Sequence, residues 1–246
     1  AGTDAALGLT LDELPAGFPR PRIPEGEEVT EARVALGRHL FYDTRLSLNE
    51  TQSCASCHVQ ERAFTDGRET GLGSTGESHF RNALTLTNVA YRSTLLWANP
   101  NQDSLAEQAL IPLFGAAPVE LGMGGQEDVL FARLRADPRY VALFQAAYTQ
   151  TDDPITLGNI VRALAAFQRT ILSYRSPYDR YTYGGQEDAI SESAKRGISL
   201  FFDERFECFH CHGGFDFTDS TVHALSGFVE TAFHNSAVYN VGGGRR

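Results

Sequence analysis

The chain has 246 residues, of which 42% are hydrophobic and 21% charged, proportions that are typical of a globular protein. Its formal net charge is −10 and its lysines and arginines form no cluster, which argues against nucleic acid and anionic membranes as partners. Since no run of about 18 apolar residues occurs, we expect no membrane span.

The first 28 residues are rich in proline and glycine, and they predict an extended arm laid over the surface. A helix should begin after Thr30, a suitable N-cap, and run through EARVALGRHLF. Apolar residues spaced three and four apart predict further helices in SLAEQALIPLF, EDVLFARLRADPRYVALFQAAY and TLGNIVRALAAFQRTILSY. In the last segment, one helix face should hold Ile160, Leu164, Phe167 and Ile171. Because no convincing alternating strand pattern occurs, we expect an all-α fold.

One segment of the sequence occurs twice. GRHLFYDTR (37–45) resembles GISLFFDER (197–205), since both follow the pattern G-x-x-L-F-aromatic-D-x-R, and each leads directly into a CxxCH motif. The two copies predict two related domains that arose by duplication. We expect the arm to cover residues 1–28, the first domain residues 29–185 and the second domain residues 186–246.

The two CxxCH motifs contain all four cysteines of the chain, so none is left for a structural disulfide. In a c-type haem site the two thiols add to the haem vinyl groups, and the adjacent histidine ligates the iron from the proximal side. The sequence therefore predicts two covalently bound haems. Their attachment residues and iron-ligating histidines would be Cys54, Cys57 and His58 for the first haem, and Cys208, Cys211 and His212 for the second.

Two other kinds of site use similar motifs. Zinc ribbons also pair two CxxC motifs, but normally about 15–20 residues apart, whereas the first cysteines here are 154 residues apart (208 − 54). A dithiol redox pair does not require a histidine after its second cysteine. Haem is therefore favoured over both. His210, inside the spacer of the second motif, is expected to face solvent.

Two haems alone do not distinguish an electron carrier from an enzyme. A carrier caps both irons, usually with methionine or histidine, whereas a peroxidase leaves one iron open. Met123 is the only methionine, so two methionine caps are impossible. The possible histidine caps are His39, His79, His223 and His234. At this point both functions stay open.

Several longer segments resemble those of one family. They are LFYDTRLS, FRNALTLTNVAY, WANPNQDSLAEQALIPLFGAAPVELGM, RGISLFFDERFECFHCHGG and FHNSAVYN. In this order, over about residues 30–240, they resemble the bacterial di-haem cytochrome c peroxidase and MauG superfamily. The third segment is most similar to the methanobactin-associated di-haem oxidases, the MbnH-like branch. The resemblance implies two cytochrome c-like haem domains, the first with an open haem.

The resemblance also implies roles for single residues. Gln108 matches a residue on the distal side of the open haem. Pro112, four residues on and hence on the same helix face, is assigned to the same site and should kink or end the helix. Glu120 matches the family's distal acid, Trp97 an electron relay between the haems, and Asn82 a ligand of an interdomain calcium ion. From the residues alone, the acid fits a surface loop, the tryptophan a core or interface, and the asparagine a turn cap.

The function that the resemblance implies is a reaction with hydrogen peroxide at the first haem, which forms high-valent iron. One oxidising equivalent would be shared with the second haem through Trp97, and a partner protein would then be oxidised, as the MbnH-like branch does at a tryptophan. One alternative is a cytochrome c peroxidase that reduces peroxide with electrons from a small cytochrome or cupredoxin. The other is a non-enzymatic di-haem electron carrier. The family resemblance further implies a periplasmic location.

The second haem domain is expected to be incomplete in this chain. Only 34 residues follow His212 (246 − 212), while the family supplies the other axial ligand of this haem from a downstream segment. That ligand is methionine in the peroxidase branch and tyrosine in the protein-oxidising branch. His234 and Tyr239 do not lie where the family places it.

Overall fold

The computed structural model describes residues 11, 14, 16–229 and 233–234. Over these residues the chain forms α-helices and short 3-10 helices, with isolated β-bridges and no β-strand, which confirms the expected all-α fold. The α-helices are α1 (Glu31–Tyr42), α2 (Cys54–Cys57), α3 (Leu105–Gln108), α4 (Leu110–Phe114), α5 (Glu127–Arg135), α6 (Pro138–Ala147), α7 (Leu157–Arg169), α8 (Pro177–Thr182) and α9 (Glu192–Phe201). No described helix is long and apolar enough to cross a membrane.

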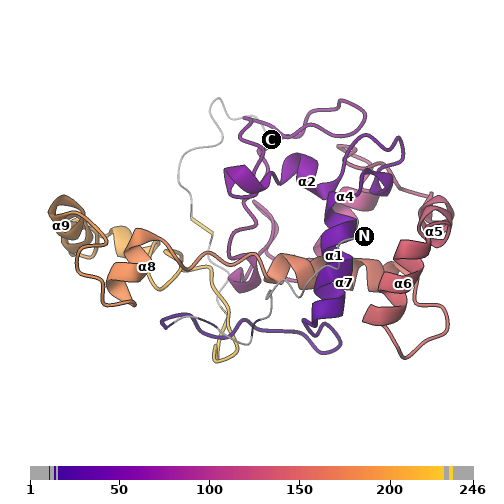
Figure 1. Cartoon of the computed structure of the whole chain (residues 1–246). Coiled ribbons are helices and arrows are strands. Elements are labelled where there is room, and N and C mark those ends of the chain that lie inside the picture. The colour runs from indigo at the N-terminus through magenta and orange to yellow at the C-terminus, as the bar shows by residue number, and fades with distance from the viewer. Residues whose placement is uncertain (1–10, 12–13, 15, 230–232, 235–246) are drawn as a thin grey trace.

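The hydrophobic core lies where α1 crosses α7 (Figure 1). Leu36 and Leu40 of α1 and Ile160 of α7 are fully buried there. The two helices approach closely because Gly37 has no side chain: a β-carbon at this position would lie 1.9 Å from the carbonyl oxygen of Ala163. This packing fixes the helices that flank the first CxxCH motif.

The first helix begins where the sequence predicts. The Thr30 hydroxyl caps α1 by accepting a hydrogen bond from the Arg33 N–H at 3.3 Å. Two other predicted helices are interrupted. SLAEQALIPLF divides into α3 and α4 at Ala109, one turn before Pro112, whose nitrogen has no hydrogen to donate to the preceding turn.

The second interrupted helix divides because its sequence contains a start signal. Asp137 caps α6 by accepting from the Arg139 N–H at 2.9 Å, and Pro138 occupies the first helical position. The expectation for Ile171 is wrong, because α7 ends at Arg169 and leaves this residue beyond the helix. Ile160, Leu164 and Phe167 are buried as expected.

The sequence repeat recurs as a structural repeat. Each copy ends its helix, α1 or α9, just before an aspartate whose Oδ1 accepts from the backbone N–H two residues later, at 2.9 Å in both. The surroundings differ, however. Figure 1 shows α8 and α9 set apart from the body that holds α1 and α7, and neither α8 nor α9 buries a residue.

The described part of the arm packs against both halves of the chain. Phe18 is buried, with its ring edge-on to Tyr91 and to Phe215. The Tyr91 hydroxyl donates to the Pro19 carbonyl at 2.7 Å, and the Ala224 N–H donates to the Arg20 carbonyl at 2.8 Å. The boundaries of the arm and of the two domains stay predictions.

Candidate functional site

The first CxxCH motif forms a single helical turn, α2. The His58 N–H donates to the Cys54 carbonyl at 3.0 Å, so the thiols of Cys54 and Cys57, three apart, lie on one side of the turn. The His58 Nδ1 lies 2.9 Å from the Phe64 carbonyl oxygen. A carbonyl can only accept, so Nδ1 carries the proton and Nε2 is left with the lone pair that a metal requires.

Burial sets the electrostatics around this turn. Burial raises the pKa of the Cys54 thiol to about 12 and that of Cys57 to about 11, with the charge of Glu120 contributing to both. Burial thus favours the neutral form of both thiols. Burial also lowers the pKa of His58, which keeps the imidazole neutral and able to ligate iron.

The second motif repeats this geometry. The His212 N–H donates to the Cys208 carbonyl at 3.0 Å, and His212 Nδ1 lies 3.1 Å from the Phe217 carbonyl oxygen. The two acceptor residues share a further feature: Phe64 and Phe217 have φ values of +59° and +51°. This left-handed backbone is uncommon for a bulky residue, and it turns the carbonyl toward the histidine in both copies.

These two carbonyl acceptors were missed from the sequence, although a signal exists. Each acceptor begins an FTD tripeptide, at residues 64–66 and 217–219, so the repeat extends past the CxxCH motifs. The two sites differ in exposure. His58 is partly covered by its surroundings, whereas His212 is exposed. His210 is exposed, as predicted.

Two adjoining cavities lie beside the first motif. The smaller, of about 70 Å³, is lined by the thiol residues and His58 together with Gln108, Pro112 and Glu120. The larger, of about 860 Å³, falls within the range of roughly 300–1,000 Å³ that is typical of sites for small molecules and cofactors. The donor set and the space therefore both fit a haem. Three residues assigned to the distal side from the sequence are thus brought together.

Glu120 lies in a turn that follows α4. The Leu121 N–H donates to the Pro112 carbonyl at 2.9 Å, which fixes the turn against that helix. Burial raises the pKa of the Glu120 carboxyl, and the imidazole of His79, with Nε2 3.9 Å from Glu120 Oε1, acts in the opposite direction. The sequence offered His79 only as one of four possible haem caps and not as a neighbour of Glu120, because its approach to Glu120 depends on the fold of a long glycine-rich loop.

Trp97 and Asn82 lie side by side on the larger cavity. The Trp97 indole Nε1–H donates to the Asn82 backbone carbonyl at 3.2 Å, and the Arg81 guanidinium lies 6.0 Å from the ring centre. The indole is 39% exposed.

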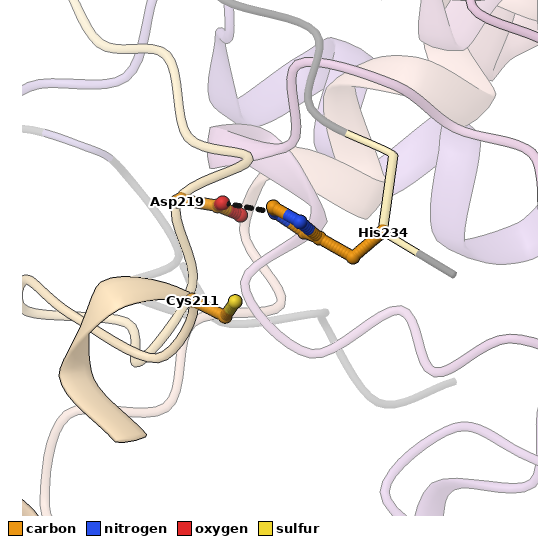
Figure 2. Close-up of side chains that lie close together, drawn as sticks. All are labelled: Cys211, Asp219 and His234. Atoms are coloured by element: carbon orange, nitrogen blue, oxygen red, sulfur yellow. Dashed lines mark hydrogen bonds and ion pairs between the residues drawn. The ribbon is translucent and has the colours of Figure 1, made fainter. Parts of the chain in front are cut away.

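Three potential metal ligands gather at the second motif (Figure 2). The ligand atoms of Cys211, Asp219 and His234 lie within 4.8 Å of one another, and His234 Nε2 is 2.5 Å from Asp219 Oδ2. Cys211 is one of the two predicted attachment thiols, so this cluster coincides with the predicted second haem site. Tyr239 lies outside the described residues. Met123 is fully buried in the core around the first site.

Comparison with known proteins identifies the family. A family model for di-haem cytochrome c peroxidase matches residues 31–188. The chain belongs to the di-haem cytochrome c peroxidase and MauG family. Haem is therefore the cofactor that this family implies for the site.

Relatives in this family include both of its named types. The methylamine utilization protein MauG of Methylophilus methylotrophus is 36% identical over 87% of this chain and 60% of its own length. The cytochrome-c peroxidase IdrP1 of Pseudomonas sp. strain SCT is 33% identical over 92% of this chain and 59% of its own length. The chain thus spans about three fifths of the curated relatives that it matches.

One solved structure is more similar still. It is a MauG-like protein associated with microbial copper homeostasis, 44% identical, with a TM-score of 0.89 over 93% of this chain and 65% of that one. Its similarity is consistent with the MbnH-like branch that the sequence segments indicate.

Removing one pair of thiols should remove one covalent haem. In the double variant Cys54→Ser/Cys57→Ser we expect half the covalent haem of the unaltered protein, because each motif is predicted to attach its own haem independently. The measurement is the intact mass after denaturation together with total haem content. His210→Ala, inside the second motif but exposed, is the control and should keep both haems. Two covalent haems in the double variant would contradict the assignment.

Proposed function

We propose that this chain forms the peroxide-reactive part of a di-haem oxidoreductase that uses hydrogen peroxide to oxidise a partner protein. One observation supports the proposal above all. Glu120, Gln108 and Pro112 line the same small cavity as the attachment residues of the first haem. An acid and an amide beside an open iron are what a peroxide site needs, whereas an electron carrier needs a coordinating side chain there.

The residues around this cavity would divide the work as follows. When bound, the haem supplies the iron that accepts the oxidising equivalents of peroxide. The Glu120 carboxylate takes the proton from one peroxide oxygen and returns it to the leaving oxygen. The Gln108 amide donates a hydrogen bond that orients the peroxide. Pro112 has no backbone N–H, so it offers no hydrogen-bond donor where it lines the cavity.

Burial suits Glu120 to this task. A base works best when its pKa is close to the operating pH, and burial raises the pKa of this carboxyl toward that range. Glu120 lies in a turn that is hydrogen-bonded to α4, so the backbone that carries its carboxyl is held in place as the proton moves.

The oxidising equivalents would leave the first haem through Trp97. This indole lines the larger cavity beside the first motif and is also partly exposed, so it can connect the buried site to its surroundings. The partner would be a protein, oxidised at a tryptophan side chain, in the bacterial periplasm. The Asn82 side chain would supply one oxygen ligand of a calcium ion that holds the tryptophan segment.

A second candidate function is peroxide reduction with electrons from a small redox protein. The relative named cytochrome-c peroxidase IdrP1 favours it. The two activities differ in the source of the electrons that reduce peroxide, which is a side chain of the partner protein in one and a small redox protein in the other. Supplying reduced small cytochrome as the only electron source tests for the second. Its rapid, peroxide-dependent oxidation would favour the peroxidase.

The proposed function is tested on the haem-loaded protein by absorption and electron paramagnetic resonance spectra. We expect one high-spin ferric haem and one low-spin haem, with a spectral change at both on adding hydrogen peroxide. Two low-spin haems in every redox state, with no response to peroxide, would instead identify an electron carrier.

The relay role of Trp97 has its own test. In Trp97→Phe we expect peroxide to change the spectrum of the first haem as before, while the second haem no longer follows, because the phenyl ring is a poorer electron donor and lacks the N–H bonded to Asn82. Phe80→Leu is the matched control, since Phe80 is exposed and lines the same cavity. An unchanged response of the second haem in Trp97→Phe would exclude the relay.

A further inference from the structure

A glycine-rich loop, residues 71–81, folds back on itself beside the first haem site. We call it the distal loop. Leu72 and Ser78 pair across it in an antiparallel bridge. The Gly73 N–H donates to the Glu77 carbonyl at 2.8 Å, and the His79 N–H donates to the Gly71 carbonyl at 2.8 Å. Backbone bonds on both sides of its tip thus give the loop a defined shape.

The distal loop is docked on the turn that carries the distal acid. The Ser74 N–H donates to the backbone carbonyl of Glu120 at 2.7 Å, and the carboxylate of Glu77 accepts from the Val119 N–H at 3.1 Å. The approach requires glycine: a β-carbon on Gly73 would lie 1.8 Å from the Val119 carbonyl oxygen. Two hydrogen bonds and one close backbone contact therefore hold the turn that carries Glu120 against the distal loop.

The end of the distal loop brings a side chain to the acid itself. His79 Nε2 lies 3.9 Å from Glu120 Oε1, and both side chains are mostly covered, at 22% and 30% exposure. Both line the larger cavity next to His58. The separation slightly exceeds a hydrogen bond, and bonds of this kind often tighten when a catalytic site is occupied.

We propose that His79 is a positioning residue for Glu120: its imidazole fixes the orientation of the carboxylate toward the open side of the first haem, and the docked distal loop holds it there. The inference rests on the proposed function, since it assigns a partner to the acid of that site. A carboxylate with one oxygen bound to an imidazole N–H has its second oxygen directed to the reactant. The same N–H stabilises the charged carboxylate, which its burial disfavours.

Cyanide binding to the ferric haem-loaded protein tests this role without turnover. Hydrogen cyanide loses its proton when the anion binds iron, and a correctly placed distal base assists binding by taking that proton, so the affinity reports on the position of Glu120. In His79→Leu we expect cyanide affinity to fall by about tenfold or more, the effect of losing a hydrogen bond to a charged group. In His79→Gln the side-chain N–H remains, and most of the affinity should be retained. His39→Gln, on α1, is the control for replacing a histidine elsewhere.

The docking of the loop has a separate readout. In Glu77→Ala the Val119 N–H loses its acceptor, so hydrogen exchange should quicken in the peptide that contains Val119 and Glu120. Glu69→Ala removes an exposed acid from the preceding segment and is the matched control. Both measurements use spectra of the open haem to confirm that each variant is folded and loaded.

The outcomes separate the two proposals. If the unaltered protein has no open haem and binds no cyanide, the proposed function and this inference both fail. If the unaltered protein binds cyanide and His79→Leu binds it equally well, with the same dependence on pH, then Glu120 is placed without His79 and only this inference is overturned. A loss in His79→Leu that glutamine restores supports it.

Discussion

Replacing Glu120 by glutamine lowers the rate at which the haem-loaded protein reacts with hydrogen peroxide by about 10²–10⁴-fold, the usual contribution of a positioned acid–base group. Glutamine keeps the size of the side chain but cannot take the peroxide proton. The measurement is a stopped-flow record of the spectrum of the first haem after mixing with peroxide. Binding of the haem should be unaffected, because Glu120 is not one of its attachment residues.

The control is Glu107→Gln, which changes an exposed acid next to Gln108 on α3 and should react normally. The dependence on pH adds a second check. The base works when ionised, and burial raises its pKa, so the rate should rise with pH through a midpoint above that of an ordinary glutamate. This step should vanish in Glu120→Gln. An unchanged rate in that variant would show that the distal acid is another residue.

The largest expected effect on stability is at Gly37. In Gly37→Ala the added methyl would lie 1.9 Å from the Ala163 carbonyl oxygen and 2.9 Å from the Phe167 β-carbon. Both are parts of α7 that cannot move without separating it from α1. We expect a loss of at least about 1–3 kcal/mol in the free energy of unfolding, as for other overpacked cores, measured by urea denaturation of the haem-loaded protein.

The repeat offers an internal control for this variant. Gly197 occupies the same place in the second copy of the sequence pattern, but a β-carbon there would meet nothing within 4 Å. Gly197→Ala should therefore be neutral or stabilise α9 by up to about 1 kcal/mol, because alanine has the higher helix propensity. Equal effects at the two glycines would contradict the role given to the α1–α7 contact.

The parts of the fold that the sequence predicted are those set by neighbours in the chain. Thr30 caps α1 through a residue three positions away. Each CxxCH motif likewise forms its turn from its own residues, with the N–H of its histidine bonded to the carbonyl of its first cysteine. The division between α3 and α4 was signalled by Pro112, but its position at Ala109 was not, since a proline fixes only the neighbourhood of a break.

The remainder depends on contacts between distant segments. His79 lies near Glu120 because Gly73 allows the distal loop to pack closely against Val119. The sequence around His79 gives no signal of this packing. The two phenylalanine carbonyls are a different case. The repeated FTD tripeptide can be read from the sequence. Its role follows only from the structure, in which the left-handed backbone of the phenylalanine turns its carbonyl toward the histidine.

Those two carbonyls have a consequence for how the haems would differ. Hydrogen bonding at the far nitrogen of an iron-bound histidine sets how strongly that ligand donates electron density to the metal, and so helps set the reduction potential. Here both histidines meet the same kind of acceptor at nearly the same distance, 2.9 and 3.1 Å. Their electronic push on iron should be closely matched. Any division of labour between the haems must then arise on their opposite faces and from how far each is shielded from water.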